Sequence, residues 1–513
     1  MWITRFCGII CIMNMSKYKN QIILFSIIAL GSLLRIVNIS KRDFWYDEAF
    51  TGITIRDNFS GMMKIITNDV HPPLYYILVK YFSALWNYNA FGIRLFSAIF
   101  GVLCLVAIYF FALELFDKKT ALWTSFLSAI GPFAIQYSQE ARMYTMYCFF
   151  IILSSYFFLR ALKTKEYKFY LLWGFFLGVS ALTHFMSFVF IIVFYLVFLA
   201  WNFNFPKSKK LKNKILHYFK LLLPGVKLIS GYFLALLTFS PWILNFLKSL
   251  SAADLDWIKP VAFSDVFYNI QMFIFGIPPG EMSAGMPSPN VLKNTYPSTV
   301  LVLVAIFFTS LLIYLLFFKK EIRKTLIVSS LSLGFMLIVY FVSLAGSQYF
   351  VPRYLMPANY FIFILVARWL SGIRFRYSFS IILFYLFLLY FAMVPVQASE
   401  GWHAMTNNLQ KYNGKNFYSL NSFDYVIAKY YLGGERLTLY NIDWPQYNPY
   451  FWAAIGSDLK RTENYDDIKN DPNALIIYNV QAKREYRSDK TFDFKKDSLN
   501  LVDRYKNVLI YKF

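Results

Sequence analysis

The sequence predicts a mainly α-helical membrane protein, in which a polytopic bundle of transmembrane helices is followed by a small α/β domain. Of the 513 residues, 58% are hydrophobic and 21% are aromatic, and the mean hydropathy is +0.46. Soluble globular proteins do not have this balance. Apolar stretches of about 20 residues also recur, which is the length that a helix needs to cross a bilayer. We therefore expect a membrane domain over residues 1–397 and a soluble domain over residues 398–513.

About 11 stretches are apolar enough to form transmembrane helices. The stretch 169–202 is divided in two, because a single helix of that length would extend about 50 Å and exceed one crossing. The expected spans cover residues 21–38, 95–116, 121–138, 143–162, 169–183, 184–202, 228–246, 298–318, 325–345, 358–371 and 378–397.

The net charge of +23 is concentrated in short loops of the membrane part. The C-terminal region is nearly neutral, with 16 Lys and Arg against 14 Asp and Glu, so the charge does not indicate a nucleic-acid partner. Alternate loops of the membrane part hold 23 Lys and Arg and 4 Asp and Glu, whereas the opposite side holds 12 and 10. The positive-inside rule therefore predicts a multi-pass protein of the cell membrane with a cytoplasmic N-terminus and an extracytoplasmic C-terminal domain.

Two regions outside the membrane have predictable local structure. In the first outer region, residues 40–94, amphipathic patterns predict short interfacial helices over residues 59–67 and 73–86. In the C-terminal region, a helix over Ser422–Leu432 is expected to end at the following pair of glycines. Short strands are expected at residues 416–420, 437–442, 474–480 and 507–513.

Polar residues gather at the outer ends of the predicted spans. Asp47 and Glu48 follow the first span and lie among aromatic residues, where two adjacent anions are costly unless they have a function. Charged residues on one side of the membrane predict a shared polar cavity at its outer surface. The further clusters are residues 68–76, 137–144 and 348–354, with His184 at the outer turn of the hairpin 169–202.

Several of these residues also have a simpler structural interpretation. Arg142 and Arg353 could extend to lipid headgroups, and Glu140 could pair with Arg142. His184 alone is typical of a hydrogen-bonded helix end. The adjacent carboxylates after the first span are harder to explain in this way, because an aromatic belt at the interface gains nothing from two anions.

Three segments carry a family resemblance, namely Trp45 to Ala49 (WYDEA), residues 69–76 (DVHPPLYY) and residues 137–144 (YSQEARMY). In this order and spacing they resemble the bacterial and archaeal branch of the protein-mannosyltransferase-like glycosyltransferases. These GT-C-fold enzymes are related to protein O-mannosyltransferases and to the lipid A aminoarabinose transferase. The resemblance covers about residues 20–400 and implies a GT-C-type fold for the membrane domain.

The resemblance implies an integral membrane glycosyltransferase. Such enzymes move a sugar, a hexose or a pentose, from a polyprenyl-phosphate carrier to an extracytoplasmic acceptor, which is a lipid, glycan or protein of the cell envelope. The reaction needs a base for the acceptor hydroxyl and positive or hydrogen-bonding groups for the departing phosphate. Direct displacement by the acceptor would invert the anomeric centre.

The family motifs imply roles for individual residues. Asp47 matches the general base, and Glu48 would support it or bind the acceptor. Arg142 and Arg353 would bind the donor phosphate, because arginine is always charged and can bind bidentately. His71 would also lie at the phosphate, although some relatives have lysine there, which weakens this role. The residues expected to contact sugar or acceptor are Asp69, Gln139, Glu140, Tyr144, Tyr354 and His184.

Metal dependence and the functional class stay open at the level of sequence. Some relatives bind a divalent metal, and Asp47, Glu48, Asp69, His71 and Glu140 could supply ligands, but the sequence does not define a geometry. No other cofactor is expected. The alternative function is a transporter or flippase, a class that often has internal repeats and helices broken near the midplane. Here the charges lie at the outer edge and no repeat is visible, which favours the enzyme.

Overall fold

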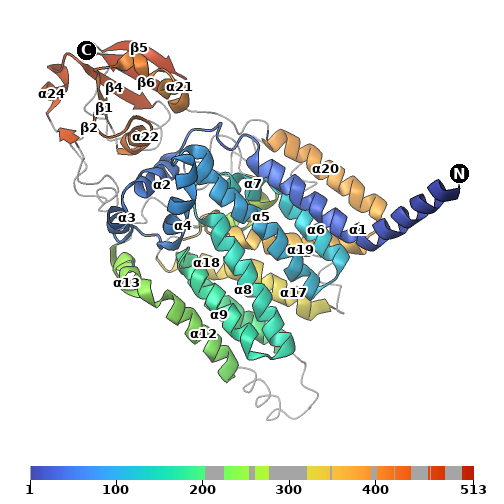
Figure 1. Ribbon diagram of the computed structural model, residues 1–513. Coiled ribbons are helices and arrows are strands. Elements are labelled where there is room, and N and C mark those ends of the chain that lie inside the picture. Colours follow the sequence, from blue (N-terminus) through green and yellow to red (C-terminus); the bar gives the residue numbers. More distant parts are fainter. Residues whose placement is uncertain are drawn as a thin grey trace.

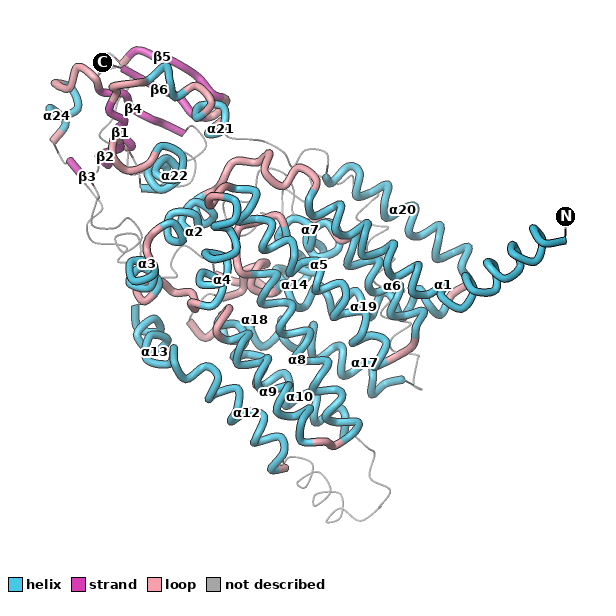
Figure 2. The backbone as a smooth tube through the Cα atoms, in the orientation of Figure 1, coloured by secondary structure: helices cyan, strands magenta, loops and turns pink. Residues whose placement is uncertain are grey.

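The computed structural model describes residues 2–202, 225–252, 260–276, 321–346, 349–393, 401–420, 422–440, 460–462, 464–479 and 499–512. Long helices form a bundle, and a small domain built around a β-sheet lies against one end of it (Figure 1). Figure 2 shows the same division by secondary structure, with every strand of the described residues in the small domain.

Ten of the predicted spans coincide with helices, and the predicted span at residues 298–318 lies outside the described residues. Within the described residues, six helices are long and apolar enough to cross a membrane. The bundle consists of α1 (Trp2–Ile36), α5 (Ala90–Leu115), α6 (Lys118–Ile130), α7 (Pro132–Ser138), α8 (Tyr144–Thr164), α9 (Tyr167–Ala181), α10 (Val189–Asn202), α12 (Val226–Phe239), α13 (Ile243–Ala252), α14 (Ser264–Phe275), α17 (Ile322–Ser329), α18 (Phe335–Leu344), α19 (Met356–Gly372) and α20 (Phe375–Met393).

The third predicted span is broken into α6 and α7. Pro132 has no backbone N–H, so carbonyl groups at the end of α6 lose their intrahelical donors. Arg35 of α1 is fully buried and replaces these donors, because its Nη2 donates to the carbonyl of Ser128 and its Nη1 to the carbonyl of Ala129, both at 3.0 Å. Its Nε donates to Ser138 Oγ at 3.2 Å. One guanidinium therefore connects the end of α6 to the end of α7.

Helices α9 and α12 pack backbone against backbone. A Cβ atom on Gly174 would lie 2.0 Å from the carbonyl oxygen of Gly231, and a Cβ atom on Gly231 would lie 2.4 Å from the Trp173 ring. Small residues at helix interfaces allow this close approach in membrane proteins. Neither glycine therefore has room for a side chain.

Short helices occupy the first outer region, and they are α2 (Tyr46–Arg56), α3 (Phe59–Ile66), α4 (Leu74–Ser83) and η1 (Ala84–Trp86). The helices expected over residues 59–67 and 73–86 are confirmed. Asp47 and Glu48, which follow the first predicted span in the sequence, lie in the first turn of α2. Lys80 of α4 donates to the carbonyl of Ile55 at 2.9 Å, so α4 covers the C-terminal end of α2.

The C-terminal region forms a six-stranded sheet in the order β3-β2-β1-β4-β6-β5. Strands β3, β2, β1 and β4 are parallel neighbours, whereas β6 is antiparallel to β4 and β5. The predicted helix and four predicted strands are confirmed, while β3 and β5 were not predicted. The elements are α21 (Trp402–Thr406), η6 (Leu409–Tyr412), β1 (Asn416–Ser419), α22 (Ser422–Leu432), β2 (Leu437–Tyr440), β3 (Lys460–Thr462), α24 (Tyr465–Lys469), β4 (Ala474–Asn479), β5 (Asn500–Tyr505) and β6 (Val508–Lys512).

Candidate active site

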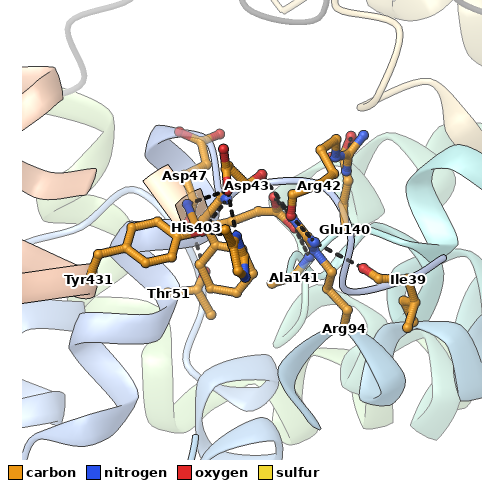
Figure 3. Close-up of polar contacts among 12 residues, drawn as sticks. Ile39, Arg42, Asp43, Asp47, Thr51, Arg94, Glu140, Ala141, His403 and Tyr431 are labelled. Atoms are coloured by element: carbon orange, nitrogen blue, oxygen red, sulfur yellow. Dashed lines mark hydrogen bonds and ion pairs between the residues drawn. The ribbon is translucent and has the colours of Figure 1, made fainter. Parts of the chain in front are cut away.

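The second carboxylate of α2 is part of a buried ion pair. Glu48 is fully buried, and its oxygens accept from Arg94 Nε at 2.7 Å and from Arg94 Nη2 at 2.6 Å. The backbone N–H of Ala141 donates to the same carboxylate at 2.8 Å. Figure 3 shows Arg94 and Ala141 at this junction of α2, α5 and the turn after α7. Both Glu48 oxygens are therefore engaged within the protein.

Arg94 also holds the loop that precedes α2. Its Nη1 donates to the carbonyls of Ile39 and Arg42 at 2.9 and 2.7 Å, and its Nη2 donates to the carbonyl of Asp43 at 3.1 Å. Burial alone would raise the pKa of Glu48, but the adjacent Arg94 charge outweighs burial and lowers it. The pair stays ionised, and it fixes the position of the first turn of α2.

Asp47, the neighbour of Glu48, has a different environment. It is half-buried, and no donor among the described residues forms a hydrogen bond with its carboxylate. Its backbone carbonyl accepts from Thr51 Oγ1 at 3.0 Å and from Arg142 Nη1 at 3.3 Å. The Asp47 charge interacts electrostatically with Arg142 and Arg353. The carboxylate is thus positioned by the backbone, with two cations in electrostatic range.

A chain of hydrogen bonds connects Asp69, His71 and Arg142. The Nδ1 atom of His71 lies 3.0 Å from Asp69 Oδ2, and its Nε2 atom lies 3.1 Å from Arg142 Nη2. A guanidinium can only donate, so Nε2 accepts and Nδ1 carries the proton donated to Asp69. Tyr76 joins the chain, because its hydroxyl donates to Asp69 Oδ2 at 3.3 Å. This chain sets the orientation of the Arg142 guanidinium.

Arg142 is 2% exposed and lies between α2, α4 and the turn after α7. Its Nη1 also donates to the Tyr76 hydroxyl at 3.2 Å and to Thr51 Oγ1 at 3.3 Å. Its Nε is buried and has no hydrogen-bond partner among the described residues. A buried guanidinium with one N–H donor that forms no hydrogen bond within the described residues is suited to binding an anionic oxygen.

Arg353 lies among aromatic rings next to the first turn of α2. It is 7% exposed, and its guanidinium carbon lies 5.8 Å from the centroid of the Trp45 ring and 5.5 Å from that of the Tyr354 ring. Cation–π contact of this kind stabilises a buried arginine without neutralising its charge. Arg353 therefore keeps its positive charge beside the first turn of α2.

His184 lies between α9 and α10, as expected, and caps the short helix η2 (Phe185–Phe188). Its Nδ1 accepts from the backbone N–H of Met186 at 3.2 Å. Its ring centroid lies 5.0 Å from that of Tyr354 and 5.9 Å from that of Tyr144. These three side chains, expected to contact sugar or acceptor, form one aromatic group.

Gln139 has partners in the first helix. Its Nε2 donates to the carbonyls of Leu34 and Val37, both at 3.0 Å. These carbonyls lie at the C-terminal end of α1, where helix carbonyls lack intrahelical donors. The structure therefore places the Gln139 amide nitrogen at the end of α1, and its contact with sugar stays a prediction.

Glu140 is 1% exposed, and neither of its oxygens has a hydrogen-bond partner among the described residues. The pairing with Arg142 considered from the sequence is not formed between side chains, and Arg42 Nη2 lies 3.9 Å from Glu140 Oε1 instead (Figure 3). Burial raises the pKa of Glu140 to about 7, although the Arg42 charge opposes this rise.

The side chains that could supply metal ligands do not form a metal-binding group within the described residues. Within the described residues, no set of three or more His, Cys, Asp and Glu side chains is placed to hold an ion. Glu48 is occupied by Arg94, and Asp69 by His71. Among the described residues, the donor set therefore does not fit a resident divalent metal.

Sequence reasoning missed Arg94 and Asp43. Arg94 lies at the start of a predicted transmembrane helix, where a charge is costly unless it is paired. This cost could have indicated from the sequence that Arg94 has a buried anionic partner. Asp43 accepts hydrogen bonds from the C-terminal domain, at residues 401–403. No sequence pattern signals this second contact, because it joins residues about 360 positions apart in the chain.

Known proteins share both a sequence segment and the fold. Residues 70–244 match the family model described as dolichyl-phosphate-mannose-protein mannosyltransferase. The structure of ArnT from Cupriavidus metallidurans in the apo state superposes with a TM-score of 0.62 at 12% identity, over 95% of this chain and 97% of that chain. No curated protein sequence matches the chain.

The match to the mannosyltransferase family model covers about a third of the chain, and the superposition shows that the chain shares the GT-C fold of ArnT. The GT-C fold expected for its membrane domain is thereby confirmed, and so is a multi-pass membrane protein. ArnT bound to undecaprenyl phosphate superposes with a TM-score of 0.54 at 12% identity, over 95% of this chain and 97% of that chain. The archaeal oligosaccharyltransferase AglB from Archaeoglobus fulgidus, in complex with an inhibitory peptide and a dolichol-phosphate, superposes with a TM-score of 0.50 at 14% identity, over 82% of this chain and 64% of that chain.

Proposed function

We propose that this GT-C protein transfers a sugar from a polyprenyl-phosphate carrier to an acceptor outside the cytoplasm. Structures of similar fold have been determined with undecaprenyl phosphate and with a dolichol-phosphate, which supports a carrier of this class. The acceptor belongs to the cell envelope, as a lipid, glycan or protein. The rival function of transporter or flippase is not favoured, because the family match and the shared fold are those of glycosyltransferases.

One observation carries the proposal. The Asp47 carboxylate has no hydrogen-bond donor among the described residues, although buried Arg142 and Arg353 are in electrostatic range. A carboxylate held without a donor can accept a proton, and nearby cations can stabilise a departing phosphate. An ion pair with a purely structural role would instead have its oxygens bound, as those of Glu48 are.

The reaction then follows a direct displacement. The acceptor hydroxyl oxygen forms a bond to the anomeric carbon, and the bond between that carbon and the carrier phosphate oxygen breaks. The hydroxyl proton passes to Asp47, and the electron pair of the broken bond leaves with the polyprenyl phosphate. Attack from the face opposite the phosphate inverts the anomeric centre. Arg142 and Arg353 stabilise the charge that develops on the phosphate.

The other residues have supporting roles in this scheme. Glu48 fixes the turn that carries Asp47, because both of its oxygens bind Arg94. Asp69 and His71 orient Arg142 through their hydrogen-bonded chain. In this scheme His71 acts on the phosphate indirectly, by way of Arg142. The aromatic group of Tyr144, His184 and Tyr354 provides ring surfaces for the sugar.

The test is transfer in vitro from a panel of polyprenyl-phosphate sugars, comparing wild type with Asp47→Asn. Loss of the base is expected to lower kcat by about 10²- to 10⁴-fold, because this is the usual contribution of a general base. The carrier should still bind, since Arg142 and Arg353 are unchanged.

The matched control is Asp57→Asn, at the exposed end of the same helix, which should retain wild-type kcat. An Asp47→Asn enzyme as active as wild type would disprove the base assignment. Failure of the wild-type protein to transfer any sugar of the panel would contradict the proposed donor class.

A further inference from the structure

The C-terminal domain reaches the loop that carries the candidate base. Asp43 Oδ2 accepts from the backbone N–H groups of Gly401 and Trp402 at 2.8 and 3.0 Å. Its Oδ1 accepts from the backbone N–H of His403 at 2.9 Å and lies 2.5 Å from His403 Nδ1. The Asp43 carboxylate is 4% exposed and satisfies the first turn of α21. Figure 3 shows this contact between Asp43 and His403.

The backbone at Gly401 is adapted to this contact. Gly401 has a φ of +112°, and a Cβ atom there would lie 1.9 Å from the carbonyl oxygen of Tyr505 in β5. Only glycine combines this backbone conformation with so close an approach. The turn that binds Asp43 is therefore anchored in the sheet of the C-terminal domain.

Helix α22 of the same domain packs directly on α2 (Figure 1). A Cβ atom on Gly52 would lie 2.5 Å from the Tyr430 ring, so this ring of α22 packs directly on the backbone of α2. Arg56 Nη1 donates to the carbonyl of Tyr430 at 2.8 Å, and its guanidinium lies 4.1 Å from the ring centroid. At the N-terminal end of α2, the ring centroids of Tyr46 and Phe423 lie 4.6 Å apart.

The loop before α2 has a further contact to α22. The backbone N–H of Phe44 donates to the Tyr431 hydroxyl at 2.9 Å, and the Phe44 ring lies 4.5 Å from the Tyr430 ring. The opposite side of the loop is bound by Arg94, which also donates to the carbonyl of Asp43. The segment around Asp47 is thus held by the membrane domain on one side and by the C-terminal domain on the other.

We propose that the C-terminal domain is a positioning part of the active site, acting through Asp43 and the contact of Gly52 with Tyr430. This inference rests on the proposed function of Asp47. The Asp47 carboxylate has no hydrogen bond of its own among the described residues, so its direction depends on the backbone of α2. Because Asp43 and Gly52 lie on either side of Asp47, the C-terminal domain sets that direction.

Two variants separate this role from chemistry, since neither residue touches the proposed phosphate site. Asp43→Asn removes the anion and one acceptor for the α21 turn. Gly52→Ala forces α2 and α22 apart, yet alanine favours the helix itself, so a loss cannot come from weakening α2. Each is expected to lower kcat roughly 10- to 100-fold with little change of KM for the donor, as a misplaced catalytic group does. If Asp43→Asn does not fold, Gly52→Ala alone carries the test.

The control is Asp471→Asn, which removes a carboxylate that accepts from Asn416, Tyr418 and Asn473 within the sheet domain. It should retain wild-type kcat. A readout independent of activity is hydrogen exchange of the peptide over residues 44–56. Exchange should quicken in Asp43→Asn and Gly52→Ala but not in Asp471→Asn, because α2 loses its support only in the first two.

The outcomes distinguish the two proposals. A wild-type protein that transfers no sugar contradicts the proposed function, and the exchange comparison then still tests whether the domain orders α2. Wild-type kcat and wild-type exchange in both Asp43→Asn and Gly52→Ala would overturn the positioning role. Equal losses in Asp471→Asn would also overturn it, since the effect would then come from the stability of the sheet domain.

Discussion

Glu48 and Glu140 are both glutamates with almost no exposure, yet their neighbours shift their pKa values in opposite directions. Arg94 binds both oxygens of Glu48 and lowers its pKa against the effect of burial. Among the described residues, the ion-pair partner of Glu140 is Arg42, at 3.9 Å, and burial prevails over this weak pairing and raises the pKa of Glu140 to about 7. The protonation state of a buried carboxylate therefore depends on the geometry of its partner.

Replacing Glu140 should change how stability depends on pH. Its pKa is about 7 in the folded protein and near 4.5 when unfolded, so the folded state binds more protons between these values. Stability therefore falls as pH rises from about 5 to 8, by roughly 3 kcal/mol in total from this group. Glu140→Gln should remove this dependence and stabilise the protein at pH 8.

Thermal unfolding of the purified protein in detergent, at several values of pH, measures this effect. Glu435→Gln, at an exposed position of the C-terminal domain, should follow wild type. A Glu140→Gln midpoint that keeps the wild-type slope between pH 5 and 8 would contradict the assignment.

At the scale of elements, a broken helix brings the site together. Pro132 ends the run of α6, and α7 then leads into the turn that carries Ala141 and Arg142. The buried Arg35 replaces the donors lost at this break. A continuous helix through residue 138 would place the turn elsewhere, so the break is part of the architecture of the site.

Arg35→Lys should therefore lower stability by about 1–3 kcal/mol, because an ammonium cannot bind both carbonyls and the Ser138 hydroxyl as the planar guanidinium does. The measurement is the thermal midpoint in detergent. Adding Pro132→Ala should reduce the loss, since alanine restores an N–H donor for the Ser128 carbonyl. Arg376→Lys is the exposed control, and a loss as large in this control would contradict the explanation.

At the scale of the whole molecule, the charge pattern predicts which side the C-terminal domain occupies. We expect it outside the cytoplasm, on the side of Asp47, and the contact of α22 with α2 requires the two to share a side. A reporter that is active only in the cytoplasm should be silent when fused after residue 513.

The same reporter placed in the basic loop at Lys118 should be active. Activity of the C-terminal fusion would refute both the side of the domain and the topology with 11 spans. The two positions together therefore test the orientation of the chain without any enzymatic assay.

Sequence alone predicted the membrane class, most of the helix positions and four strands of the C-terminal region, because apolar periodicity and length indicate burial. It also pointed to Asp47, because a charge near hydrocarbon is costly without a role, and the family resemblance added Arg142 and His71. Tertiary structure alone decided that Glu48 pairs with Arg94, that Glu140 has no hydrogen-bond partner among the described residues, and that Asp43 binds the C-terminal domain. These features depend on residues far apart in the chain, and the partner of a side chain is set only by packing in three dimensions.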